Sequence, residues 1–159
     1  NINTNGHQAI SRHYVEPETF LRDRPSPHPD AFEAGIPQTH LVDPSPHTAR
    51  YAIRDLAHGT PLHPEDVEGL LWGASEAITN AHLHGRPPVI MRAWSRTDRI
   101  LVTISDSGDG LTCPYAGLLP AINDVGGRGL WLTHQMCQHV VHDTRSDGFT
   151  IRLTAHTNW

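Results

Sequence analysis

A glutamate and an asparagine lie one helical turn apart in the stretch EAITNAHLHG, residues 76–85. On a helix, Glu76 and Asn80 would share one face, because residues four apart are neighbours there. The amide oxygen of Asn80 suits a hard cation such as Mg2+, and the carboxylate of Glu76 can accept a proton or position a water. A solvated glutamate beside an asparagine with a local hydrogen bond explains the same spacing, so the pair alone does not identify a site.

An aspartate followed by two glycines forms the stretch DSGDG, residues 106–110. Asp106 comes at the end of an expected strand, where its carboxylate can accept a hydrogen bond from an exocyclic amine. Gly108 and Gly110 permit positive φ and the close approach of a flat ligand to the backbone. An ordinary Asp-Gly turn is an equally good interpretation of this stretch taken alone.

A second glycine-rich stretch, GGRGL, precedes an amphipathic segment. With glycine at Gly126, Gly127 and Gly129, the backbone N–H groups at the start of that helix are uncovered and can bind an anion. Arg128 adds a charge that suits a phosphate. The stretch is neither a Walker loop nor a Rossmann fingerprint. It ends a loop of more than 20 residues, which we interpret as a lid over phosphates, since long loops in compact domains are usually functional.

Taken together, the three stretches predict one nucleotide pocket. Asp106 would recognise the base, Asn80 would hold the metal, and the second glycine stretch would bind the phosphates.

Three helices are expected to position these residues. Ser45 and Pro46 form a capping residue and a first helical position, and the helix would end near Ala57 before Gly59. A second helix would open at Pro64 and end at Gly85. The third expected helix is LWLTHQMCQHV, residues 130–140.

Five strands are expected beside them. They are QTHLVDPS, which ends in turn residues, VIMRAWS and RILVTISD around a short turn, and VVHDTR and FTIRLTAH around SDG. The order β-α-α-β-β-loop-α-β-β predicts an α+β fold, a two-layer α/β sandwich. We expect a domain over residues 39–159 and, over residues 1–38, a proline-rich tail or linker with a helical turn around residues 17–21.

The composition excludes several classes of protein. The formal charge is −5 and no cluster of cations is visible, which argues against direct nucleic-acid binding. Cys113 and Cys137 are far apart and are expected to be free thiols in a reducing compartment. The 13 histidines are scattered, and His82 and His84 would face different sides of a helix, so no histidine metal site is expected. No apolar run near 18 residues and no signal peptide is present, so we expect a cytoplasmic protein without membrane association.

The same stretches resemble the motifs of the GHKL superfamily of ATPases, which have the Bergerat ATP-binding fold. EAITNAHLHG resembles the N box, DSGDG the first glycine box and GGRGL the second. FTIRL resembles the closing strand, whose threonine, here Thr150, commonly lies near the adenine. Phe149 departs from the pattern, because a small residue or threonine is frequent there. The resemblance extends over residues 39–156.

Within the superfamily the chain is most similar to the anti-sigma-factor serine kinases, the RsbW/SpoIIAB-like group. The similarity rests on the short helix expected at residues 46–57, the compact size, the residues of the N box and the short lid before GGRGL. It implies ATP and Mg2+ as cofactors, a homodimer, binding of a sigma factor, and phosphorylation of a serine or threonine on an anti-anti-sigma protein of the STAS class. HYVEPETFL, residues 13–21, is similar to the segment that ends the MEDS sensory domain, which implies the C-terminal part of such a regulator.

The resemblance also implies a role for each site residue. Glu76 would be the catalytic base, Asn80 the Mg2+ ligand and Asp106 the adenine partner. The residues expected to line the nucleotide are Asn80, Asp106, Gly108, Gly110, Gly127, Arg128, Gly129, Leu130 and Thr150.

Two other functions fit the sequence less completely. One is a binding module without kinase activity that inhibits a sigma factor by sequestration. The other is the ATP-binding half of a two-component histidine kinase. The proline-rich first 46 residues argue against the second, because they cannot form the helical hairpin that carries a phosphoacceptor histidine.

Overall fold

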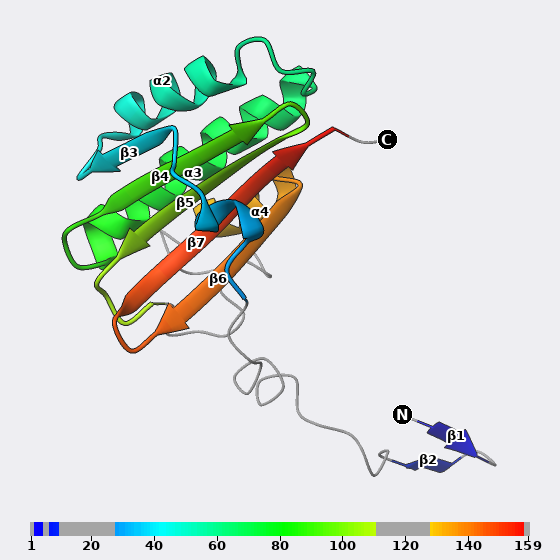
Figure 1. Ribbon diagram of the computed structural model, residues 1–159. Coiled ribbons are helices and arrows are strands. Elements are labelled where there is room, and N and C mark those ends of the chain that lie inside the picture. The colour runs from blue at the N-terminus through cyan, green and yellow to red at the C-terminus, as the bar shows by residue number, and fades with distance from the viewer. Residues whose placement is uncertain (1, 5–6, 10–27, 111–127, 158–159) are drawn as a thin grey trace.

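A computed structural model of the chain describes residues 2–4, 7–9, 28–110 and 128–157 (Figure 1). Five antiparallel strands form one sheet, in the order β3-β4-β5-β7-β6. The strands are β3 (Thr39–Val42), β4 (Ile90–Arg96), β5 (Arg99–Asp106), β6 (His139–Arg145) and β7 (Gly148–His156). The two predicted hairpins and the short first strand are confirmed.

Three helices cover one face of this sheet (Figure 1): α2 (Pro46–Ala57), α3 (Pro64–His84) and α4 (Arg128–Met136). The predicted start of α2 is confirmed, because the Ser45 side chain accepts a hydrogen bond from the Thr48 amide at 3.1 Å and Pro46 follows. The predicted span of α3 is also confirmed, with Gly85 as its C-terminal cap. Within the described residues, no helix is long and apolar enough to cross a membrane.

The hydrophobic core lies between these helices and the sheet. It includes Ile53 of α2, Leu70 and Ile78 of α3, and Val102 and Ile104 of β5, all at most 2% exposed. Because side chains alternate along a strand, the residues between them point to the opposite face of the sheet. We call that opposite face, which the helices do not cover, the outer face.

A short segment, residues 28–36, crosses the outer face (Figure 1). It contains the 3-10 helix η1 (Ala31–Ala34), which is closed by a capping box between Asp30 and Glu33. The Trp94 indole donates to the Gly35 carbonyl at 2.9 Å and so joins the segment to β4. This part of the predicted tail is therefore packed on the domain, which the sequence did not indicate.

Two further features differ from the prediction or escaped it. The third helix ends at Met136 and not near residue 140, because His139 and Val140 already pair with β7 as the first residues of β6. Strands β1 (Ile2–Thr4) and β2 (His7–Ala9) form a separate antiparallel pair that was not predicted. The helical turn predicted around residues 17–21 lies outside the described residues.

Candidate functional site

Glu76 and Asn80 lie on the C-terminal half of α3, as predicted. The Asn80 Nδ2 atom donates a hydrogen bond to Glu76 Oε1 at 3.2 Å. A carboxylate can only accept, so the amide nitrogen faces Glu76 and the carbonyl oxygen of Asn80 is directed away from it. That oxygen has no hydrogen-bond partner among the described residues. It is the kind of ligand that Mg2+ prefers, so the geometry fits the metal role predicted for Asn80.

The first turn of α4 packs directly against Glu76. A Cβ added at Gly129 would overlap the Glu76 carboxylate. Glycines also allow the close contact farther along: a Cβ at Gly73 would lie 2.6 Å from Cys137 Sγ, and one at Gly69 would lie 2.9 Å from the Met136 carbonyl carbon. The contact brings the N-terminus of α4, whose first N–H groups have no partner within the helix, next to Glu76.

The loop between β5 and α4 supplies the other predicted phosphate-binding residues. Arg128 and Leu130 belong to the first turn of α4. Gly127 lies outside the described residues. Gly110 has φ 77°, in the left-handed region that favours glycine, as predicted. A Cβ there would lie 2.8 Å from Thr144 Oγ1, so the chain passes closely over the end of the β6–β7 hairpin.

Asp106 ends β5 and faces the helices, with 8% of its surface exposed. Its Oδ1 atom accepts two backbone hydrogen bonds, from Gly108 at 2.7 Å and from Arg86 at 3.2 Å. Gly85 and Gly108 both lie so close that an added Cβ would come within 2.6 Å of the carboxyl group. The second oxygen, Oδ2, has no hydrogen-bond partner among the described residues. One oxygen is therefore fixed by the chain, and the other can accept from a ligand.

These residues follow one another along α3. Gly85, which touches Asp106, comes five residues after Asn80 and nine after Glu76. At about 1.5 Å per residue, Gly85 and the Asp106 carboxylate that it touches lie about 7.5 Å beyond Asn80 and about 13.5 Å beyond Glu76 along the helix axis. The groups predicted to recognise the base, to hold the metal and to accept the proton thus follow one another in the order that an extended nucleotide would need.

Thr150 does not join this group. In the β5–β7 register Asp106 pairs with Phe149 and Ser105 pairs with Thr150. Partners across a ladder point to the same face, so Phe149 shares the helix-facing side with Asp106. Thr150 lies on the outer face, where its Oγ1 is 2.9 Å from Ser105 Oγ. Its predicted contact with a nucleotide stays a prediction, and Phe149 is the residue of β7 that shares the side of Asp106.

A pair of histidines behind Phe149 was missed by sequence reasoning. The rings of His134 on α4 and His142 on β6 meet edge to face, with centroids 5.0 Å apart, and both Nε2 atoms are buried without a partner. Burial lowers the pKa of His134, and burial together with the neighbouring His134 lowers the pKa of His142 to about 4. Both rings are therefore neutral near pH 7. Nothing in the scattered histidines pointed to this pair.

Other predicted groups have structural roles in the described part of the chain. His82 Nε2 lies 2.9 Å from the Pro44 carbonyl oxygen, so it joins α3 to the segment before α2. Cys137 is a buried free thiol, as predicted, while Cys113 lies outside the described residues. Among the described residues, no group of three or more His, Cys, Asp or Glu side chains is arranged to hold a metal ion.

A comparison with protein families assigns the fold. The model of the family described as "Histidine kinase-like ATPase domain" matches residues 44–155. The chain belongs to this family. The five-stranded antiparallel sheet with its helices is the α+β fold of these GHKL-type ATPase domains, as predicted. In this ATPase domain the matched range contains every site residue predicted from the sequence.

Several solved structures are similar to the chain. The Mycobacterial sensor histidine kinase MprB is 18% identical with a TM-score of 0.45, over 57% of this chain and 72% of that one. The histidine kinase domain of the Erythrobacter litoralis EL346 blue-light activated histidine kinase is 15% identical with a TM-score of 0.49, over 82% and 66%. The histidine kinase domain of the E. coli osmosensor EnvZ is 10% identical with a TM-score of 0.45, over 79% and 92%. A search of curated proteins finds no match. The family assignment therefore rests on the match over residues 44–155.

Proposed function

We propose that this ATPase domain binds ATP with Mg2+ and transfers the γ-phosphoryl group to a serine or threonine of a protein partner. The observation that carries the proposal is the arrangement of three residues along α3. Asp106, whose Oδ2 has no hydrogen-bond partner among the described residues, lies at one end, followed by Asn80 and then Glu76. The family supports ATP-dependent phosphotransfer in general. The choice of a hydroxyl acceptor rests on the resemblance to serine kinases in the motif residues.

Each of these three residues has a separate proposed role. Asp106 Oδ2 accepts a hydrogen bond from the exocyclic amine of adenine, while its Oδ1 stays bound to the chain. The Asn80 carbonyl oxygen holds Mg2+, which supplies charge neutralisation for the phosphates when it is bound. The N–H groups in the first turn of α4 face the same region and favour negative charge there.

Glu76 is the proposed general base. Its Oε1 already accepts from Asn80, which leaves Oε2 to take the proton of the attacking hydroxyl group. As the hydroxyl oxygen bonds to the γ-phosphorus, the bond from that phosphorus to the β–γ bridging oxygen breaks and ADP leaves. Gly129 keeps the first turn of α4 against the same carboxylate and so fixes where the phosphates lie relative to the base.

The test is phosphate transfer to the cognate STAS protein with ATP and Mg2+. Wild type should label the partner, and Glu76→Gln should lose labelling but keep ATP binding. Glu68→Gln is the matched control, because Glu68 is an exposed residue of the same helix whose ion pairs with Arg50 and Arg54 are long, 3.8 and 3.5 Å. Undiminished labelling with Glu76→Gln, or none with wild type, would refute the kinase proposal.

We further propose, on the resemblance alone, that the domain acts as a homodimer, binds a sigma factor and keeps it inactive. Pull-down of the sigma factor by wild type, and its release when the STAS partner and ATP are added, would be the expected result. A sigma factor that stays bound under these conditions would argue against the switch.

One observation favours the second candidate, a sequestering module without kinase activity. Phe149 pairs with Asp106 on the helix-facing side, where a small residue or threonine was expected. A phenyl ring there reduces the space beside the adenine partner. Calorimetry with ATP and ADP separates the candidates: no binding by wild type with sigma binding kept supports sequestration. Phe149→Thr is the companion variant, and nucleotide binding that appears only in this variant would assign the loss to the ring.

A further inference from the structure

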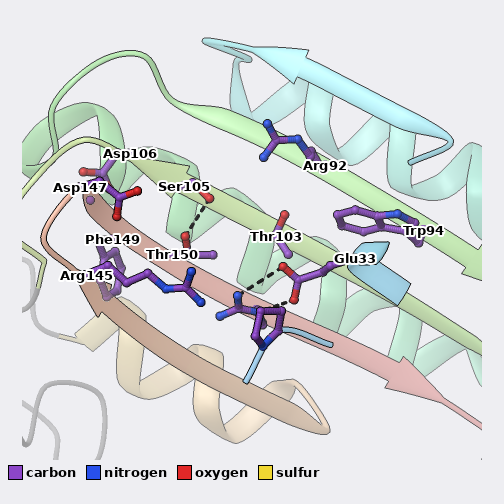
Figure 2. Close-up of a pocket in the computed structure, with 13 residues that line it drawn as sticks. Glu33, Arg92, Trp94, Thr103, Ser105, Asp106, Arg145, Asp147, Phe149 and Thr150 are labelled. Atoms are coloured by element: carbon purple, nitrogen blue, oxygen red, sulfur yellow. Dashed lines mark hydrogen bonds and ion pairs between the residues drawn. The ribbon is translucent and has the colours of Figure 1, made fainter. Parts of the chain in front are cut away.

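A cavity lies on the outer face of the sheet, and at one end its lining reaches Asp106 and Phe149, which also border the proposed nucleotide site. Figure 2 shows the residues that line it, which come from residues 28–36, from strands β4, β5 and β7, and from the end of the β6–β7 hairpin. Its volume is about 360 Å³. This size lies within the range of small-molecule sites, about 300–1,000 Å³. Three arginines and three hydroxyl side chains line it: Arg92, Arg145, Arg152, Thr103, Ser105 and Thr150.

Two of the three arginines are already paired. Arg152 contacts Glu33 through Nε at 2.5 Å and Nη2 at 3.2 Å, and Asp143 through Nη1 at 3.3 Å. Arg145 contacts the same oxygen of Asp143 at 2.9 Å. Burial alone would lower the pKa of Arg152, but hydrogen bonds and charge from Glu33 and Asp143 raise it above its ordinary value. These pairs leave no excess positive charge around Arg152.

Arg92 differs, because it has no hydrogen-bonded or ion-paired partner among the described residues. It is half-buried on β4, opposite Thr103 in the β4–β5 register. In Figure 2 no interaction joins it to another side chain of the lining. A guanidinium group presents planar N–H donors that fit a carboxylate or phosphate, so a half-buried one without an acceptor is well placed to bind an oxyanion.

The hydroxyl side chains supply further donors beside Arg92. Ser105 Oγ and Thr150 Oγ1 are 2.9 Å apart, and such a pair uses only one of its two hydroxyl hydrogens. Thr103 is 2% exposed, and its hydroxyl group has no partner among the described residues. Three acids also line the cavity. Glu33 is bound to Arg152, Asp147 is exposed to solvent, and Asp106 reaches the cavity from the end of β5 with its Oδ1 already bound to Gly108 and Arg86.

We propose that this cavity binds a small oxyanion, a carboxylate or phosphate group, with Arg92 as its charged partner and the hydroxyl groups of Thr103, Ser105 and Thr150 as neutral donors. Pro29 and Glu33 of the segment that crosses the outer face also line the cavity. Proline has no N–H group and the Glu33 carboxylate can only accept, so the anion would be bound by the sheet residues and not by these two.

The test is titration of the whole chain with inorganic phosphate and, separately, with succinate at constant ionic strength, followed by amide NMR shifts. Saturable shifts are expected at Thr103, Ser105 and Thr150 with at least one probe. Saturable shifts with phosphate alone would indicate a phosphate ligand, and saturable shifts with succinate alone would indicate a carboxylate ligand. Shifts confined to Gly108 and Gly110 would mean binding at the nucleotide site only and would overturn the proposal, as would no saturable shift with either probe.

Variants make the assignment specific. Arg92→Gln should weaken binding of the active probe by at least about tenfold, because a charge-assisted pair is lost. Arg54→Gln, the same change at an exposed position of α2, should bind as wild type does. Ser105→Ala is a second test that changes no charge. It should weaken binding of the probe, and thermal melting should show that the variant is still folded. Wild-type affinity in both Arg92→Gln and Ser105→Ala would refute the site, whatever the outcome of the kinase assay.

Discussion

Replacing Asp106 by asparagine changes its Oδ2 atom, which makes no hydrogen bond to the described part of the chain. The Asn side chain keeps an Oδ1 atom, so the hydrogen bonds from Gly108 and Arg86 can remain. At the Oδ2 position it presents an N–H donor in place of an acceptor. The exocyclic amine of adenine is also a donor, so the variant meets the base with two donors facing each other.

The magnitude follows from the lost bond. A hydrogen bond to a charged group contributes about 1.5–3 kcal/mol, which corresponds to roughly 10- to 150-fold in affinity. Guanine carries a carbonyl oxygen where adenine carries the amine, so the same change should improve binding of GTP. Folding stability should fall by no more than about 1 kcal/mol, because the bonds to Oδ1 are retained but lose the charge of the carboxylate.

Calorimetry with ATP and GTP measures both effects, and urea denaturation measures stability. Asp109→Asn is the matched control: it makes the same change in the same loop, at an exposed residue whose partner is Arg86 at 2.7 Å. The control should keep the preference for ATP. If Asp106→Asn bound ATP as wild type does, Asp106 would not contact the base, and the order of groups along α3 would need another explanation.

Three further changes test other parts of the structure. Burial lowers the pKa of His142 from 6.5 to about 4, so the unfolded chain binds this proton first as the pH falls. Stability should therefore decrease between pH 6.5 and pH 4, by up to about 3 kcal/mol, and urea denaturation of His142→Phe should show a smaller decrease. Arg152→Met leaves Glu33 without its guanidinium partner and leaves the 1% exposed Asp143 with Arg145 alone, and should cost about 3 kcal/mol by the same method, the lower end for a broken buried pair. Burial raises the pKa of Cys137 to about 12, so in a Cys113→Ser variant a thiol reagent at pH 8 should react only after unfolding.

Most of the fold could be predicted because its signals are local. Ser45 and Pro46 mark the start of α2, and the alternating residues of β5 mark a strand with two different faces. The predicted end of the third helix was wrong because residues 137–140 are too few to distinguish a helical from a strand pattern of apolar residues. Pairing with β7 decides the matter, and that contact is not local in the sequence.

The outer-face contacts could not be predicted for the same reason. Arg152 alternates with the buried Ile151 and Leu153, which is the pattern of a strand with one solvent-exposed side. Its partner Glu33 is 119 residues away, inside a segment whose prolines indicated a linker. A salt bridge between two such positions does not change the pattern of apolar and polar residues in either segment, so the sequence does not predict it.

For the candidate site, the sequence predicted the residues but not the face of the sheet on which each one lies. Glu76 and Asn80 follow from helical spacing, which fixes their relative position. Whether Phe149 or Thr150 faces Asp106 depends on the β5–β7 register, and a shift of one residue would exchange them. Of the two, Thr150 fits the closing-strand motif and Phe149 does not, yet the register places Phe149 on the side of Asp106.

The same register connects the two proposed ligand sites. Ser105 and Thr150 face the cavity on the outer face, while their chain neighbours Asp106 and Phe149 face the helices. The two sites thus lie on opposite sides of the same pair of strand ends. Because Asp106 and Phe149 also line the cavity, an oxyanion there can affect nucleotide binding through these two residues as well as through the backbone. If it changes the affinity for ATP by some factor, ATP must change the affinity for the anion by the same factor, because the coupling free energy is shared.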